Sequence, residues 1–211
     1  MKAFLFDFDG TLVDSMPTWG GVMKRILNET KTKYGDDIIK IITPLGSLGT
    51  AQYFKKIGCP LSVDEILALM LKYMVYEYSN NVMAKETVIE TLHKMKERGD
   101  SLSVLTASPH NTLDPCLKRL GVFDLFDNVW SCDDFGTTKA DPKIYQMAAK
   151  RLNKDVSEII FVDDNLNADK TAVKAGMTVC GIYDESSDEY TEEIKAAASF
   201  YVYRFEELLN L

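Results

Sequence analysis

Two aspartates, Asp7 and Asp9, stand two residues apart in the N-terminal stretch AFLFDFDGTLVDS, residues 3–15. They follow an apolar run typical of a buried parallel strand, and Gly10 allows a sharp turn after them. Two carboxylates this close repel each other unless a cation neutralises them, or unless one attacks a substrate while the other transfers protons. An ordinary Asp-Gly turn would account for Asp9 and Gly10 but leaves Asp7 unexplained. The spacing therefore favours a catalytic or metal-binding loop.

Three further polar groups fall at or just beyond the ends of predicted strands. Taken singly, each has an ordinary explanation: a hydroxyl can cap a helix, a lysine is usually solvated, and paired acids favour a helix N-terminus. Taken together with the first loop, they would bring acids, hydroxyls and an ammonium group to one edge of a sheet, where ligands bind in open α/β proteins. The three groups are Thr106-Ala107-Ser108, Lys139-Ala140-Asp141-Pro142 and Asp163-Asp164.

The chemistry that needs this combination is phosphoryl transfer. A phosphate monoester carries about two negative charges at neutral pH, and these must be neutralised before an anionic nucleophile approaches. A lysine and a divalent cation can do this, and carboxylates with a main-chain carbonyl are hard oxygen ligands suited to Mg²⁺. A carboxylate nucleophile then divides hydrolysis into formation and breakdown of an aspartyl phosphate, while a second carboxyl group transfers protons.

The elements that must position these groups alternate between helix and strand after residue 83, which is the pattern of βαβ units and a parallel sheet. The expected fold class is therefore α/β. The predicted strands cover residues 3–6, 102–105, 159–162 and 178–182, and the predicted helices cover 86–98, 142–152, a segment ending at Gly176 and a segment near 190–198, before a short terminal strand and helix.

Residues 16–82 have a different character, because they contain no convincing strand. They are predicted to form about four helices, separated by Gly or Pro breaks at 34–35, 44–49 and 58–62, with the clearest helical spacing over 63–78. A helical insert thus interrupts the α/β core directly after its first strand. Its Met and Tyr side chains could line a binding groove, but packing within a small helical bundle is the preferred interpretation.

A net charge of −8 disfavours nucleic acid and anionic membrane surfaces as partners. Any phosphate site must then be locally positive. The cysteines form no Cys-x-x-Cys pair, so small buried thiols in a reducing compartment are expected. Without a signal-peptide pattern or an apolar stretch of membrane-spanning length, we expect a cytoplasmic protein. The cysteines are Cys59, Cys116, Cys132 and Cys180.

With these motifs in this order, the sequence resembles the haloacid dehalogenase-like (HAD) hydrolase superfamily, in the phosphatase branch that includes phosphoglycolate phosphatase and β-phosphoglucomutase. The resemblance runs from Lys2 to about Tyr183. It implies a Rossmann-like, doubly wound, mostly parallel sheet formed by residues 1–14 and 83–211, with residues 15–82 inserted as an α-helical C1 cap. It also implies Mg²⁺ as the cofactor and a small phosphorylated metabolite as the substrate.

The same resemblance implies roles for the acids. Asp7 matches the nucleophile that becomes phosphorylated, and Asp9 matches the general acid/base, whose backbone carbonyl also meets the metal. Thr11 matches the residue that steadies this loop. Asp164 matches the carboxylate that binds Mg²⁺, and its neighbour Asp163 is expected to bind the ion or its waters.

Four positions are implied for the phosphate itself. Thr106 matches a hydroxyl that hydrogen-bonds the phosphate, and Ala107 would supply a backbone N–H. Lys139 matches the lysine that neutralises nucleophile and phosphate. Phe8, between the two aspartates, is counted with the substrate-binding residues. The short stretch between Ala107 and Lys139 holds roughly one helix and one strand, so a second cap is not expected.

Some positions depart from the family pattern or stay open. Ala140 and Asn165 replace a usual proline and a usual serine. Asp169 comes five residues after Asp164 and is expected to be an exposed acid in a first helical turn rather than an outer-shell group at the metal.

We expect His110 to be an exposed loop histidine without a partner. Further positions are Trp19, expected in the core of the cap, Ser47, whose contact with substrate stays open, Asp14, the expected hinge into the cap, and His93, expected at the surface.

The competing functions are a phosphomutase, a receiver-like signalling module and a catalytically silent binding protein. A mutase would use both aspartates but return the phosphoryl group to a sugar; residues 44–50 show no Arg or Lys for a second phosphate, which disfavours it. A receiver-like module would be smaller and lack the helical insert. The intact acids and lysine argue against a silent protein. We expect simple hydrolysis by a monomer, with a dimer as the alternative, and a cap that opens and closes to exclude water.

Overall fold

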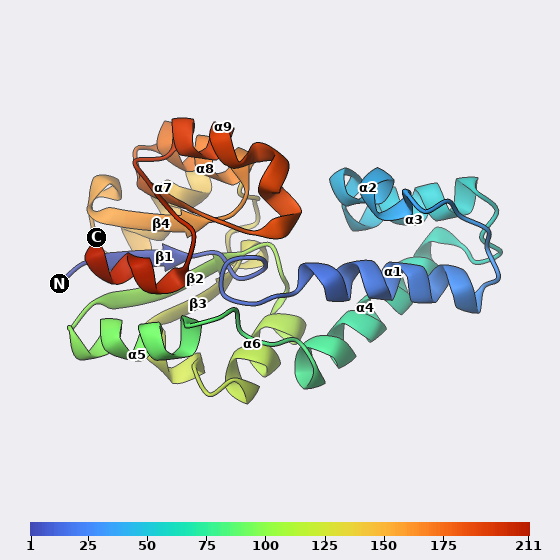
Figure 1. Ribbon diagram of the computed structural model, residues 1–211, viewed down its shortest axis with the longest axis horizontal. Helices are drawn as coiled ribbons and strands as arrows, with labels where there is room; N and C mark the ends of the chain where they lie inside the picture. Colours follow the sequence, from blue (N-terminus) through green and yellow to red (C-terminus); the bar gives the residue numbers. More distant parts are fainter. The chain divides into compact units, whose positions relative to one another are not determined.

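The computed structural model describes residues 1–211, the side chain of Pro44 excepted. It divides into two compact units (Figure 1). The first consists of Met1–Asp14 and Val82–Leu211, and the second of Ser15–Asn81, so the second unit is an insertion into the first. Among the described helices, none combines the length and the apolar character that a membrane span requires.

Within the described residues, the first unit is built on a six-stranded sheet with the order β3-β2-β1-β4-β5-β6, and every strand pair is parallel. The strand order reverses between β1 and β4, as in doubly wound Rossmann-like sheets, which confirms the predicted fold class. The strands are β1 (Ala3–Phe6), β2 (Ser101–Thr106), β3 (Asn128–Ser131), β4 (Ile159–Asp163), β5 (Thr178–Ile182) and β6 (Phe200–Val202).

Helices cover both faces of this sheet (Figure 1). Leu5 and Phe161 pack with α7 and α8 on one face, while Phe6 contacts Phe205 of η6 on the other, with 5.5 Å between ring centroids. Burial on both faces explains why β1 is a continuous apolar run. The helices of this unit are α5 (Val88–Glu97), α6 (His110–Arg119), α7 (Lys143–Arg151), α8 (Leu166–Ala175) and α9 (Thr191–Ala197), and the short 3-10 helices are η2 (Phe123–Leu125), η3 (Cys132–Phe135), η4 (Val156–Glu158), η5 (Glu185–Tyr190) and η6 (Phe205–Asn210).

The strand register aligns the carboxyl ends of three strands. Phe6, the last residue of β1, pairs with Val104 of β2 and Val162 of β4. The backbone N–H of Asp7 then donates to the carbonyl of Val162 at 2.9 Å. Asp7 therefore leaves the sheet next to Asp163, the last residue of β4.

The second unit is helical, as its sequence predicts. Twelve of its residues form a buried cluster that includes Met70 and Tyr73, and Trp19 is partly buried against it. Most of its Met and aromatic side chains thus pack a small core, whereas Tyr76 is exposed. A capping box between Ser62 and Glu65 begins the longest helix. The helices are α1 (Met16–Glu29), α2 (Ile38–Ile42), the 3-10 helix η1 (Thr43–Leu45), α3 (Gly46–Lys56) and α4 (Val63–Asn80).

Two sequence-based boundaries are wrong. The predicted break at 44–49 is mostly helical, because the chain turns at Gly46 alone, where φ is +64°, and continues directly into α3. The helix predicted from residue 86 begins instead at Val88. Its start is delayed because Thr87 has a left-handed backbone with φ +63°, which a helix cannot include.

The two crossings of the chain between the units are paired inside the first unit. Val13 and Ala84 form an antiparallel bridge, and the N–H of Asp14 donates to the carbonyl of Met83 at 2.9 Å. The segment leaving β1 and the segment leading to α5 are therefore held side by side.

Candidate active site

The loop after β1 is a tight turn that fixes both aspartates. The carbonyl of Phe8 accepts from the N–H groups of Leu12 and Val13, at 2.9 and 3.1 Å. Gly10 adopts φ +78°, a conformation that glycine tolerates best. This turn follows the buried end of β1, and the Asp7 side chain that begins it is only 10% exposed.

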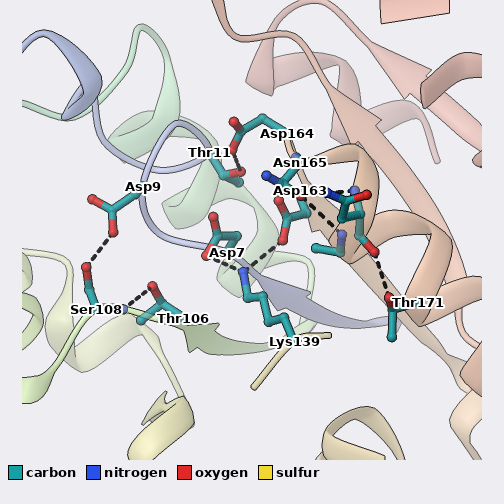
Figure 2. A network of polar contacts seen from close by, with 12 residues as sticks. Asp7, Asp9, Thr11, Thr106, Ser108, Lys139, Asp163, Asp164, Asn165 and Thr171 are labelled. Atoms are coloured by element: carbon teal, nitrogen blue, oxygen red, sulfur yellow. Dashed lines mark hydrogen bonds and ion pairs between the residues drawn. The ribbon is translucent and has the colours of Figure 1, made fainter. Parts of the chain in front are cut away.

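A single ammonium group lies between two carboxylates at the centre of the site (Figure 2). Lys139 Nζ makes ion pairs with Asp7 Oδ1 and with Asp163 Oδ2, the latter at 2.8 Å. Tyr145 anchors the backbone of Lys139, because its buried hydroxyl lies 3.1 Å from the carbonyl oxygens of both Lys139 and Ala168. The lysine predicted to face the first aspartate is thus brought to it.

Burial makes the charges of this cluster costly. It raises the pKa of Asp7 to about 7, although Lys139 acts to lower it. Burial, followed by repulsion from Asp163 and Asp7, raises the pKa of Asp164 well above its ordinary value. Burial also opposes the charge of Lys139, but attraction from Asp163 and Asp7 outweighs it and raises the pKa of this lysine. One ammonium group therefore does not balance the acids, and a further cation would favour their ionised forms.

The donor set fits a hard divalent cation. Among the described residues, Asp7, Asp163 and Asp164 form one group whose ligand oxygens lie within 4.8 Å of one another. Carboxylate oxygens at a strand edge are ligands that suit Mg²⁺. Thr11 donates to Oδ1 of Asp164 at 3.0 Å and orients it, whereas both oxygens of Asp163 are engaged, by Lys139 and by the N–H of Asn165 at 2.8 Å.

Asp169 lies behind this group and corrects the sequence analysis. It is fully buried in α8 rather than exposed, and within the described residues neither of its carboxylate oxygens has a hydrogen-bond partner. Burial, then repulsion from Asp163 and Asp164, raises its pKa well above the usual value. The expectation of an exposed acid is wrong because α8 turns this position inward, toward Gly181 of β5. Burial without a hydrogen-bond partner thus favours the neutral form of this carboxyl group.

Asp9 is held away from Asp7 by a serine (Figure 2). Ser108 Oγ donates to Asp9 Oδ2 at 2.5 Å, and the N–H of Ser108 donates to the hydroxyl of Thr106 at 3.0 Å. The two aspartates are thus in different environments, one paired with a lysine and the other with a hydroxyl. Ala107, between the two hydroxyl residues, is exposed at this edge.

The remaining sequence-predicted positions are distributed differently. The Phe8 side chain is fully buried in the core, so only its backbone is available to a ligand. Asn165, in place of the usual serine, caps α8 by accepting from the N–H groups of Asn167 and Ala168, at 3.0 and 3.2 Å. Ser47 is exposed in the second unit.

Gly10 approaches Asp164 so closely that no side chain fits. A Cβ on Gly10 would lie 2.7 Å from both carboxylate oxygens. We expect Gly10→Ala to lower turnover of a phosphate ester roughly 100-fold and to lower the free energy of unfolding. Gly121→Ala is the matched control, because Gly121 has a similar φ of +74° but open space around its Cα; it should lose about 1 kcal/mol from backbone strain alone and keep its turnover. Equal turnover in the two variants would contradict the steric argument.

His110 is not the unpartnered loop histidine that the sequence suggests. It is the first residue of α6, with Nδ1 2.8 Å from Asp114 and Nε2 2.9 Å from Asp134. Hydrogen bonds to Asp114 and then to Asp134 raise its pKa above 6.5. Because Asp134 is distant in sequence, this partner could not be predicted. His93 is exposed, as expected.

The paired histidine gives a pH-dependent stability. Because the pKa of His110 is higher in the folded protein, the imidazolium stabilises the fold fully when the pH is below the unfolded-state pKa of about 6.5. This stabilisation is lost as the pH rises through the folded-state pKa. We therefore expect His110→Gln to be destabilised at pH 5.5, by less than about 1 kcal/mol because the pair is partly exposed, and to match the wild type at pH 9. Urea unfolding at both pH values measures this, with His93→Gln as the control. A difference that grows with pH would refute it.

Sequence comparison relates the chain to a family of hydrolases. The model of the haloacid dehalogenase-like hydrolase family matches residues 1–176. Pyrophosphatase PpaX of Bacillus velezensis is 31% identical over 184 residues, covering 86% of this chain and 83% of the relative. Phosphoglycolate phosphatase of Colwellia psychrerythraea is 28% identical over 204 residues, covering 90% and 89%.

Solved structures share the fold. CbbY from Rhodobacter sphaeroides, crystallised with phosphate, superposes with a TM-score of 0.81 at 20% identity, covering 99% of this chain and 96% of that one. The parallel sheet with helices on both faces defines the fold class as Rossmann-like α/β. Within that class, the chain belongs to the haloacid dehalogenase-like hydrolase family, as its motifs predict.

Proposed function

We propose that the protein is a Mg²⁺-dependent phosphatase that hydrolyses a small phosphorylated metabolite through a phosphorylated aspartate. The observation that carries this proposal is Lys139 between Asp7 and Asp163. An ammonium group there offsets both the charge of a carboxylate nucleophile and that of an incoming phosphate. The relatives named as a pyrophosphatase and as phosphoglycolate phosphatase give further support.

In the first step, an Asp7 oxygen forms a bond to phosphorus while the bond from phosphorus to the ester oxygen breaks. The leaving oxygen takes a proton from the carboxyl group of Asp9. Asp9 suits this role because its hydrogen bond from Ser108 sets it apart from the lysine-paired Asp7. The product of the step is an aspartyl phosphate and a free alcohol.

In the second step, Asp9 accepts a proton from water, the water oxygen attacks phosphorus, and the bond between phosphorus and Asp7 breaks. Inorganic phosphate leaves and both carboxyl groups return to their starting state. The Thr106 hydroxyl and backbone N–H groups of Phe8 and Ala107 would donate to the phosphoryl oxygens, where charge spreads in the transition state.

Asp7, Asp164 and the backbone carbonyl of Asp9 would hold the Mg²⁺. Asp163 would act mainly through Lys139, since both of its oxygens are already engaged, and through waters of the ion. Bound Mg²⁺ would neutralise and orient the phosphoryl group. Residues 15–82 are proposed to be the cap, inserted into a core of residues 1–14 and 83–211, and the protein is proposed to act in the cytoplasm.

The test is phosphate release from p-nitrophenyl phosphate and from a panel of phosphorylated metabolites, with Mg²⁺ and with a chelator. Hydrolysis in ¹⁸O-labelled water should place one labelled oxygen in the released phosphate. A mutase would instead return the phosphoryl group to a sugar phosphate without releasing it. Turnover that survives complete chelation would refute the metal requirement, and isomerisation without phosphate release would refute hydrolysis.

A further inference from the structure

A second lysine, Lys85, is held at the same edge of the sheet by three acceptors. Its Nζ lies 2.6 Å from the carbonyl oxygen of Gly10, 2.7 Å from that of Tyr183 and 2.9 Å from Asp184 Oδ2. An ammonium group has three N–H donors, so all of them are used. Lys85 does not belong to the motifs that define the site, and its side chain is only 21% exposed.

The backbone of Lys85 holds the same loop. Its N–H donates to the carbonyl of Leu12 at 3.1 Å, and the preceding residue, Ala84, forms the bridge with Val13. The loop that carries Asp9 is therefore fastened by both the side chain and the main chain of this one segment.

Gly10 makes this attachment important for the site. Its Cα faces the carboxylate of Asp164 with no room for a Cβ, while its carbonyl accepts from Lys85. Gly10 is thus clamped between a metal-site acid and an ammonium group. Any displacement of Gly10 would move the neighbouring Asp9 relative to Asp164.

Asp184 secures the ammonium group from the other side. Its Oδ1 accepts from the N–H of Ser186 at 2.9 Å and from the Ser186 hydroxyl at 2.5 Å, which leaves Oδ2 for Lys85. Burial acts to raise the pKa of Asp184, but the hydrogen bonds from Ser186 and Lys85 outweigh it and lower the pKa. The carboxylate is therefore ionised at neutral pH and strengthens the contact.

We propose that Lys85 is a positioning residue for the reaction: it fixes the loop carrying Asp9 and Gly10 against the loop that follows β5. This inference rests on the proposed phosphatase function. Lys85 acts through Gly10 and does not touch the reacting atoms. Its loss therefore disturbs the alignment of the acids and leaves the phosphate-binding groups near Thr106 in place.

Lys85→Met removes the three hydrogen bonds and keeps most of the aliphatic stem. We expect kcat for p-nitrophenyl phosphate to fall about 10- to 100-fold, as for a small misplacement of catalytic groups, with KM changed less than about threefold. Hydrogen exchange measured by mass spectrometry should become faster in the peptide covering residues 7–13 and unchanged in the one covering β3. Lys94→Met is the control, because the ion pair described for Lys94 is with Glu90 at the exposed surface.

Chemical rescue separates positioning from a general loss of stability. In Lys85→Cys, alkylation of the new thiol with 2-bromoethylamine rebuilds a side chain of lysine length with a terminal ammonium group. Alkylation with iodoacetamide adds bulk without the charge. The native cysteines are all buried, and burial raises the pKa of Cys116 to about 11 and that of Cys180 to about 12, which suppresses their reaction.

Recovery of kcat by aminoethylation, without recovery by iodoacetamide, supports the proposal. It is overturned if Lys85→Met keeps kcat within twofold of the wild type, if both alkylations restore activity equally, or if exchange quickens throughout the protein. These outcomes are separate from a failure of the phosphatase proposal, which would appear as an inactive wild type. In that case the local exchange measurement still decides whether Lys85 fixes the loop.

Discussion

Replacing Asp7 with asparagine should lower turnover of p-nitrophenyl phosphate at least about 1000-fold, the scale on which the loss of a nucleophile is felt. The amide keeps the size of the carboxylate but cannot attack phosphorus, so no aspartyl phosphate forms. Initial rates with Mg²⁺ measure the loss. Acid quenching with a ³²P-labelled substrate should trap labelled protein in the wild type and none in Asp7→Asn.

Asp124→Asn is the matched control, because Asp124 is exposed on η2. It should retain wild-type turnover and labelling. Asp7→Asn should remain folded, since the substitution removes one of three buried, mutually repelling carboxylates. Labelling that persists in Asp7→Asn would move the nucleophile to another residue.

Replacing Lys139 with methionine should lower turnover about 100- to 1000-fold, on the scale of a lost electrostatic group at the reacting centre. The physical reason is that Asp7 and Asp163 lose their common counter-charge. Because Lys139 acts to lower the pKa of Asp7, its removal should raise that pKa further. A larger fraction of the nucleophile is then protonated, and the residual activity should increase with pH more steeply than in the wild type. Rate profiles between pH 6 and 9 measure this.

Lys143→Met, an exposed position at the start of α7, is the matched control and should behave like the wild type. Lys139→Arg guards against a simple folding defect. It keeps the positive charge and the fold, but a planar guanidinium cannot take the place of a compact ammonium group between two carboxylates. Lys139→Arg should therefore be more stable than Lys139→Met without regaining full activity. A fully active Lys139→Met would remove the basis of the proposed function.

The fold could be predicted from the sequence because the local signals and the global arrangement agree. The apolar run before Asp7 is buried on both faces, and each motif lies at or next to a strand end, so the parallel order alone gathers them. Boundaries were harder to predict where one backbone conformation decides them. Thr87 and Gly46 change where α5 and α3 begin, and nothing in their neighbours' hydropathy indicates this.

The acids and the lysine of the site could be predicted, but their supports could not. Ser108 lies two residues after Thr106, within a motif noted in the sequence. That position was the only indication that Ser108 would reach the site. The contact of His110 with Asp134 and the side-chain contacts of Lys85 depend on residues 24 to 99 positions away, and the burial of Asp169 depends on the rotation of a helix. A single sequence has no pattern that reports such contacts.

The bridge between Val13 and Ala84 has a consequence for how this architecture could arise and diversify. Since the entry and exit points of the inserted segment are hydrogen-bonded neighbours within the sheet-bearing unit, a short hairpin turn would close the gap between them. The sheet needs none of its strands from the insertion. Helical inserts of other lengths and sequences could therefore be exchanged at this junction while the sheet and the acids at its edge stay unchanged.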